Sequence, residues 1–211
     1  MKAAATSLLV VLFTLLDATV PRTQQGPSST SSPTLTSVLD AQLRVVEFEV
    51  VATAQAMPED KYSFAPSEGN FKGVRTFAQQ VKHIATVNNR FFDSITGQAP
   101  PAAPDEGLTS NGPDAIQTKD QILKYLRESF AYGHKAIATL NADNALAPLN
   151  DSPVFFLRTK MSLAMFACTH AMDHYGQMVE YLRMNGITPP MSAPRPSNGP
   201  APNRPTKSSS E

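Results

Sequence analysis

The sequence predicts an all-α protein, a four-helix bundle with its helices in up-down-down-up order. Four segments of about twenty residues or more carry apolar side chains at three- and four-residue spacing, which is the period of one helix face. Each segment is bounded by a helix-capping or a helix-stopping residue. No segment shows the apolar-polar alternation of a half-buried strand. Amphipathic helices without strands bury their apolar faces against one another, which predicts a bundle.

The first predicted helix runs from about Leu35 to Met57 and stops at Pro58, because proline cannot continue a helix. The connection after it carries Tyr62 and Phe64, which we expect to close one end of the core rather than to bind a ligand. The apolar stripe of this helix consists of Leu35, Leu39, Leu43, Val46, Val50, Ala54 and Met57.

The second predicted helix starts at Thr76, which forms a capping-box sequence with Gln79, and ends at Gly97. His83 flanks its apolar stripe. A single histidine in such a place is more often an edge residue with satisfied hydrogen bonds than a ligand. The stripe consists of Phe77, Val81, Ile84, Asn88, Phe91 and Ile95.

The third predicted helix starts at Thr118, again with a capping-box glutamine, and ends near Leu140. His134 lies at the shoulder of its stripe, and we expect it on the surface. Residues 97–117 are rich in proline, alanine and glycine and are long enough to cross the length of a helix, so helices two and three are expected to run parallel. The stripe consists of Leu123, Leu126, Phe130, Gly133, Ile137 and Leu140.

The fourth predicted helix spans residues 159–186, from a Thr159 cap to Gly186, and two prolines follow it. The loop before it carries Phe155 and Phe156, which we expect to plug the core. Cys168 is expected to be a small core residue rather than a nucleophile or a ligand. The main apolar stripe is Met161, Ala164, Met165, Cys168, Met172, Tyr175, Val179 and Leu182, and a neighbouring stripe is Leu163, Ala167, His170, His174, Gln177 and Tyr181.

The two histidines of the fourth helix form the most specific chemical pattern in the chain. His170 and His174 are four residues apart, which puts their Cβ atoms about 5–6 Å apart on one helix face. Two imidazoles so placed hold one metal ion in helical zinc sites. The alternative is a polar seam in which backbone or water satisfies both rings. A zincin-type protease is disfavoured, because its motif needs glutamate where this chain has Ala171.

A third histidine joins this pair if the topology is as predicted. Helices two and four are then antiparallel neighbours. His83 lies in the N-terminal part of helix two and His174 in the C-terminal half of helix four, so antiparallel packing brings them to one level. His83, His170 and His174 can therefore meet between the two helices, as a metal site or as a polar seam. Three imidazoles do not distinguish zinc, nickel, iron, copper or manganese.

Both ends of the chain lie outside the predicted bundle, which spans residues 35–187. Residues 1–20 combine a basic start with a short apolar run, which is typical of a secretory signal and predicts a periplasmic or extracellular protein. The alternatives are an uncleaved anchor or a miscalled start. Residues 21–34 are predicted to be a disordered linker, and 188–211 a disordered tail rich in proline and serine.

Charge and cysteine content exclude several classes of partner. The formal net charge is zero, so no basic surplus indicates nucleic-acid binding. We expect no stable membrane insertion once the signal is cleaved, because its apolar run is too short to span a bilayer. A single cysteine excludes an intramolecular disulfide. A small-molecule substrate and a homodimer both stay open.

Three segments resemble the DinB-like (DinB/YfiT) superfamily, in particular its exported bacterial branch. They are MPEDKYSFAP at 57–66, RTFAQQVKHI at 75–84 and HAMDHYGQMVEYLRMNGITPP at 170–190, and the likeness covers residues 35–190. The resemblance implies a four-helix bundle with a long crossover between helices two and three. It also implies a divalent metal on His83, His170 and His174. Family members of known activity are metal-dependent transferases or isomerases that use low-molecular-weight thiols.

Three functions are compatible with these observations. The first is a metal-dependent enzyme, either a thiol S-transferase or a hydrolase, whose ion has positions open beyond the three imidazoles. The second is a non-enzymatic module that binds a metal or a small ligand. The third is a bundle with vestigial histidines. No catalytic residue is assigned from the sequence.

Overall fold

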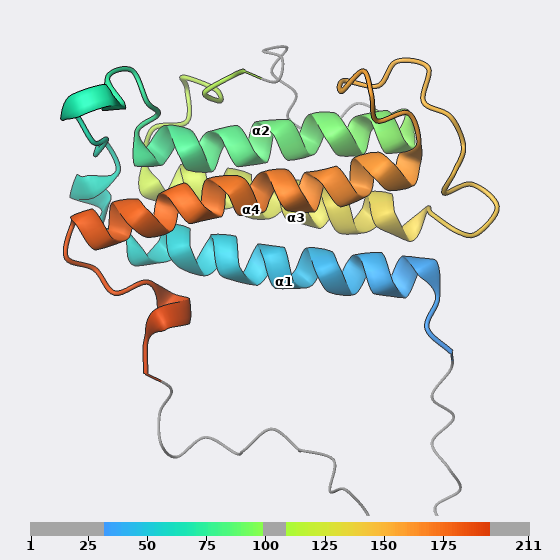
Figure 1. The fold of residues 1–211 in the computed structure, drawn as a ribbon, viewed down its shortest axis with the longest axis horizontal. Helices are drawn as coiled ribbons and strands as arrows, with labels where there is room; N and C mark the ends of the chain where they lie inside the picture. Colours follow the sequence, from blue (N-terminus) through green and yellow to red (C-terminus); the bar gives the residue numbers. More distant parts are fainter. Residues whose placement is uncertain (1–31, 99–108, 195–211) are drawn as a thin grey trace, which may run out of the picture. The chain divides into compact units, whose positions relative to one another are not determined.

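The computed structural model describes residues 32–98 and 109–194, and in these ranges the chain is an all-α four-helix bundle, as predicted (Figure 1). The predicted signal segment and most of the predicted linker lie outside the described residues. No β-strand occurs in the described part of the chain. The long helices are α1 (Leu35–Ala56), α2 (Phe77–Thr96), α3 (Lys119–Ala138) and α4 (Lys160–Met184).

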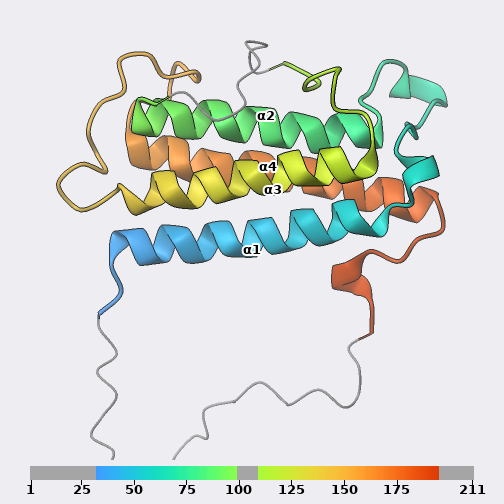
Figure 2. The same ribbon diagram turned by 180° about the vertical axis from the view of Figure 1, so that it is seen from behind.

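The helices run up-down-down-up. α1 and α4 point in one direction and α2 and α3 in the other, in both views of the bundle (Figures 1 and 2). α2 packs on α3 and α4, and α1 packs on the same two helices, so α1 and α2 face each other across the diagonal. α2 and α3, joined by a connection of which the structure describes residues 97–98 and 109–118, therefore run parallel. The predicted topology is therefore confirmed.

Local sequence signals set both ends of the helices. Each long helix starts in a capping box, in which a threonine oxygen accepts from the N3 backbone N–H and the N3 side chain accepts from the cap. Gly97 and Gly186, with φ of 67° and 72°, follow α2 and α4 in the left-handed conformation that glycine adopts at no steric cost. The N-caps are Thr34, Thr76, Thr118 and Thr159.

The core-facing side of α4 differs from the predicted stripe. Met165 is 54% exposed, whereas Leu163, Ala167 and Met178 are fully buried. The reason is that α4 packs against α1 on one flank and α2 on the other, so its buried arc is centred between the two predicted stripes. Cys168 is buried as predicted.

Aromatic residues close one end of the core, but not the other. Tyr62 is buried and donates a 2.7 Å hydrogen bond to the carbonyl of Ala54, and Phe64 packs on the core beside it, as predicted. The prediction for Phe155 and Phe156 is wrong, because they are 78% and 63% exposed. Their backbone is a turn closed by Leu157 N–H and the Val154 carbonyl, which places the two phenylalanines at its outward tip.

His134 is more than the surface residue that its position predicts. It is partly buried, with Nδ1 2.6 Å from Asp40 Oδ1 and Nε2 3.1 Å from Glu47 Oε2. Both carboxylates lie on α1. The imidazole therefore links α3 to α1, on the side of the bundle away from the other three histidines.

The chain after α4 stays on the bundle for a few residues. The 3-10 helix η3 (Pro190–Ser192) contacts α1, although composition predicts disorder from residue 188 onward. The rest of the predicted tail, from 195 to 211, lies outside the described residues. Among the described residues, no helix has the length and apolarity needed to cross a membrane.

A close contact between α2 and α3 gives a test of the packing. A Cβ at Gly133 would lie 2.5 Å from Cε2 of Phe92, a fully buried ring. We expect Gly133→Ala to destabilise the protein, because overpacking costs about 1–3 kcal/mol and exceeds the helix-propensity gain of about 1 kcal/mol. Denaturant unfolding at equilibrium measures the change.

Gly176 on α4 is the matched control. A Cβ there meets nothing within 4 Å, so Gly176→Ala should stabilise the protein by up to about 1 kcal/mol. A Gly133→Ala protein that gained as much stability as Gly176→Ala would contradict the tight α2–α3 contact.

Candidate metal centre

Three histidines from two antiparallel helices converge at one point. His83 lies on α2, and His170 and His174 lie on α4. Nε2 of His170 is 3.3 Å from Nε2 of His83 and 3.2 Å from Nε2 of His174. The ligand atoms of all three lie within 4.8 Å of one another. The structure thus brings together all three histidines that the sequence singles out, and His134 is not among them.

The ring of His83 is fixed by the crossover between α2 and α3. Its Nδ1 lies 2.6 Å from the backbone carbonyl oxygen of Ser110. Because a carbonyl only accepts hydrogen bonds, Nδ1 carries the proton and Nε2 keeps its lone pair. His83 is only 2% exposed, so no bulk water competes for this orientation.

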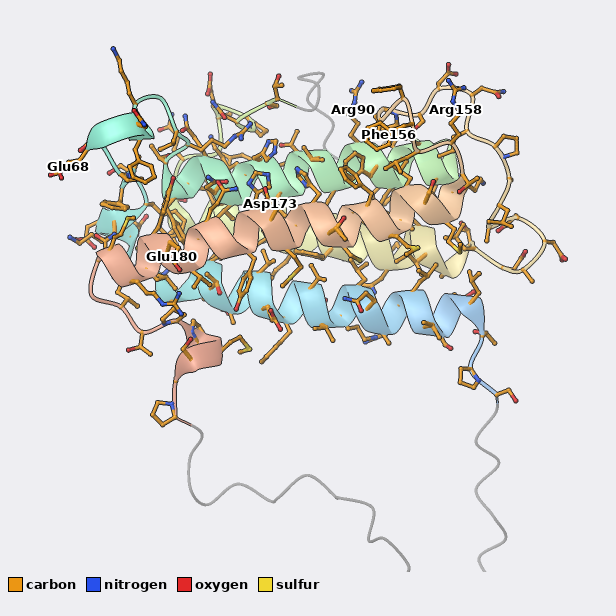
Figure 3. All side chains as sticks on the ribbon, viewed as in Figure 1. Glu68, Arg90, Phe156, Arg158, Asp173 and Glu180 are labelled. Carbon is orange, nitrogen blue, oxygen red and sulfur yellow. The ribbon has the colours of Figure 1, made fainter. Side chains whose placement is uncertain are left out.

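A chain of side-chain amides fixes His174 in the same way. Asp173 Oδ2 accepts from Gln177 Nε2 at 3.1 Å, and Gln177 Oε1 accepts from Gln80 Nε2 at 2.8 Å. Gln80 Oε1 is then left to accept from Nδ1 of His174 at 2.7 Å. Since the chain ends on a carboxylate at exposed Asp173, labelled in Figure 3, its direction leaves the lone pair of His174 on Nε2.

His170 has a different environment. Its Nδ1 is buried and has no hydrogen-bond partner among the residues that the structure describes. The rings of Phe91 and Phe166 flank it, with centroids 5.7 Å and 6.2 Å from its own. Its Nε2 faces the lone pairs of the other two rings. A proton on this nitrogen can bond to only one of them at a time, whereas a cation at the centre satisfies all three.

Burial keeps the cluster neutral. Desolvation, and next the neighbouring His174 and His83, lower the pKa of His170 to about 3. Desolvation, followed by His83 and Arg75, lowers the pKa of His174 to about 3 as well. The pKa of His83 is also lowered, mainly by burial and against the effect of the Ser110 carbonyl. At neutral pH the three imidazoles are therefore uncharged, each with one nitrogen free of a proton, which is the form that binds metals.

The arrangement fits a divalent ion. Nitrogens about 2.0–2.1 Å from a tetrahedral zinc lie about 3.3–3.4 Å apart, close to the separations of 3.2 and 3.3 Å found here. Ligand histidines in metal sites also donate their second N–H to a carbonyl, a carboxylate or water, as His83 and His174 do to oxygens of Ser110 and Gln80. The three histidines can therefore hold a metal ion whose identity the imidazoles do not specify.

The sequence does not predict which residues orient the histidines. Gln80 precedes His83 by three residues and Gln177 follows His174 by three, so each amide shares a helix face with its histidine. That spacing is the signal that could have identified them. Ser110 carries no such signal, because it contributes a backbone carbonyl from a loop.

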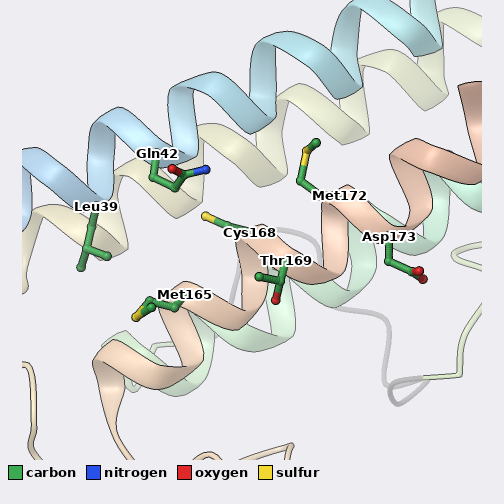
Figure 4. Close-up of a pocket in the computed structure, with 7 residues that line it drawn as sticks. All are labelled: Leu39, Gln42, Met165, Cys168, Thr169, Met172 and Asp173. Atoms are coloured by element: carbon green, nitrogen blue, oxygen red, sulfur yellow. The ribbon is translucent and has the colours of Figure 1, made fainter.

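A hollow lies on the flank of α4 that faces α1, away from the histidines (Figure 4). It has a volume of about 570 Å³ and is mostly apolar, with Leu39, Met165 and Met172 in its lining. Cys168 also lines it, but burial raises the pKa of this thiol to about 11. The thiol is therefore protonated at neutral pH, which is the form expected of a small core residue.

Acid should destabilise the metal-free protein. The ordinary pKa of a histidine is 6.5, whereas the pKa of His170 and of His174 in the folded protein is about 3. Between these pH values the two histidines take up protons in the unfolded chain but not in the folded one. Stability therefore falls as pH drops from about 6.5 toward 3 and levels off below. Denaturant unfolding of chelator-treated protein at several pH values in this window measures the slope.

The double variant His170→Gln, His174→Gln provides the comparison, because it lacks the two groups and keeps every other titrating residue. Its stability should fall less steeply over the same window. Equal slopes for the two proteins would contradict the buried, neutral state of the histidines.

One of the comparisons with known proteins gives a match. A model of the DinB superfamily matches residues 42–178, well over half of the chain and a range that includes all three histidines. No curated protein matches the chain. The matched range starts within α1 and runs into α4, so it takes in the crossover that creates the α2–α4 contact. This chain belongs to the DinB superfamily.

Proposed function

We propose that the protein binds one divalent metal ion with His83, His170 and His174 and acts on a small molecule at that ion. The observation that supports this is the convergence of three Nε2 atoms, two of which are kept free of protons by hydrogen bonds on the opposite side of the ring. Nε2 atoms 3.2–3.3 Å apart repel one another through their lone pairs unless a cation or a proton lies between them.

The residues around the cluster have separable roles. A bound divalent ion with three imidazole ligands supplies a Lewis acid with open positions for a substrate atom. The Ser110 carbonyl and the Gln80 amide hold the rings of His83 and His174 in the ligating tautomer. Phe91 and Phe166 flank His170 with apolar surface on the ring that carries the buried Nδ1.

The reaction belongs to one of two classes, metal-dependent transfer to a thiol or metal-dependent hydrolysis. In both classes His83, His170 and His174 would hold the ion, and the ion would supply a Lewis acid for the substrate. A thiol transferase follows from what the family resemblance implies. Export would favour a hydrolase, because low-molecular-weight thiols are scarce outside the cytosol. Paired screens for thiol transfer and ester hydrolysis with metal-loaded protein distinguish them.

A non-enzymatic metal or ligand carrier is the second candidate, and one observation favours it. Among the described residues no carboxylate hydrogen-bonds to any of the three clustered histidines. Asp173 reaches His174 only through the two amides of Gln177 and Gln80. Within the described residues, no carboxylate is thus placed against the histidines as an adjacent general base. Full metal content without turnover in both screens would favour this second function.

Metal content tests the ligand set. Single alanine substitutions at His83, His170 and His174 should each remove most of the bound metal, because each deletes one of three ligands. Gln80→Ala should weaken metal affinity roughly 10–100-fold, since it removes the acceptor that orients His174. Elemental analysis of purified proteins and competition with a chelator measure both effects.

His134→Ala is the control, because its imidazole is engaged with two carboxylates on α1 and lies outside the cluster. Its metal content should equal that of the wild type. The same metal content in the wild type and in a double His170→Ala, His174→Ala variant would exclude the proposed site.

Export is the second part of the proposal and rests on the basic start and apolar run of residues 1–20. Mass spectrometry of the mature protein should find its N-terminus between about residue 18 and residue 26, which is the usual layout of a signal peptide. Recovery of protein with an intact Met1 from the cytosol would contradict export and leave the metal site untouched.

A further inference from the structure

A polar cavity lies directly beside the histidine cluster. It has a volume of about 520 Å³ and lies at the N-terminal end of α2, between that helix, the crossover and α4. Gln80 and Gln177, the two amides of the chain that orients His174, form part of its wall. The remaining wall includes Arg75, Gln79 and Asn111, and no carboxylate lines it among the described residues.

Arg75 is a cation without an anion. Its Nε donates to Asn111 Oδ1 at 2.9 Å and its Nη2 donates to the Thr109 carbonyl at 3.1 Å, both neutral acceptors. Its own carbonyl accepts from the hydroxyl of Tyr181 on α4 at 3.0 Å, which fastens this segment to the bundle. Within the described ranges no carboxylate forms a salt bridge with it. Its guanidinium thus keeps N–H donors and a full positive charge for the cavity.

The two amides next to Arg75 are oriented as donors as well. The side-chain oxygen of Asn111 accepts from Arg75, so its NH₂ group stays available to donate a hydrogen bond. Gln79 uses its oxygen to accept from the backbone N–H of Thr76 in the α2 capping box, so its NH₂ group is likewise left over. Neither NH₂ group has a hydrogen-bond acceptor in the part of the chain that the structure describes.

We propose that this cavity binds an oxyanion, a carboxylate or phosphate group of the substrate, through Arg75, Gln79 and Asn111. A wall that combines an unpaired guanidinium with amide N–H donors and lacks carboxylates complements a compact group that carries negative charge and several acceptors. The inference builds on the proposed function in one respect: the substrate's other end reaches the metal ion. Substrates of this site are then anionic small molecules.

Calorimetric titration with inorganic phosphate tests the cavity in the full-length protein, as purified and again after chelation. Arg75→Gln should weaken phosphate binding roughly ten-fold or more in both preparations, because charge-assisted hydrogen bonds are lost. Arg90→Gln removes the same charge from an exposed position on α2, outside the cavity, and should bind phosphate like the wild type.

A nearly isosteric pair of variants keeps the test independent of folding. Gln79→Glu preserves the capping oxygen but adds a negative charge to the cavity, so phosphate binding should fall by a similar factor. Gln121→Glu makes the same change in the capping box of α3, away from the cavity, and should have no effect. Unchanged phosphate binding in both Arg75→Gln and Gln79→Glu would overturn the inference.

Metal content measured on the same samples separates this inference from the proposed function. Phosphate binding that depends on Arg75 in chelated protein supports the oxyanion site whatever the metal content. Metal-loaded wild type that does not bind phosphate overturns the oxyanion site and leaves the metal centre standing.

Discussion

The antiparallel contact between α2 and α4 is the constraint on which the candidate site depends. α2 supplies His83 and Gln80, and α4 supplies the other two histidines and Gln177. Their nitrogens and amides meet only because the two helices run in opposite directions at one level. That direction follows from the long crossover, since a short α2–α3 hairpin would have made α3 antiparallel to α2 and therefore α4 parallel to α2. The crossover also supplies the Ser110 carbonyl, so the segment that sets the topology takes part in the site.

Hydrogen bonds on the outer side of the imidazoles control the chemistry on the inner side. Three buried polar rings are costly unless their N–H and lone pairs find partners. His83 and His174 place their protons on fixed oxygens, and burial keeps the rings neutral. The result is a set of lone pairs directed at one another, which is unfavourable without a cation. The same bonds that stabilise the folded rings therefore prepare a site for a positive ion.

The helices that pack the bundle and the residues that form the candidate site are only partly the same. α1 packs on α3 and α4 and contributes none of the three clustered histidines, and its polar link to α3 through His134 lies elsewhere. Arg75 and Asn111 lie in connections, where they are held by hydrogen bonds to each other and to α4. A rigid helical frame thus positions the histidines, and the loops at one end add the charged wall of the cavity.

The sequence by itself determined the four helices, the capping boxes of α2 and α3 and the three histidines, because helix periodicity, caps and an i, i+4 pair are local properties of the chain. It also gave the topology, since a crossover of that length permits parallel helices. Only the tertiary structure decided which face of α4 is buried, since the sequence pattern places the exposed Met165 in the buried stripe. It likewise decided that Phe155 and Phe156 face solvent. The amide chain through Gln80 and Gln177 and the unpaired charge of Arg75 likewise required three dimensions. Their partners lie on other elements, and no local pattern encodes which side chain meets which.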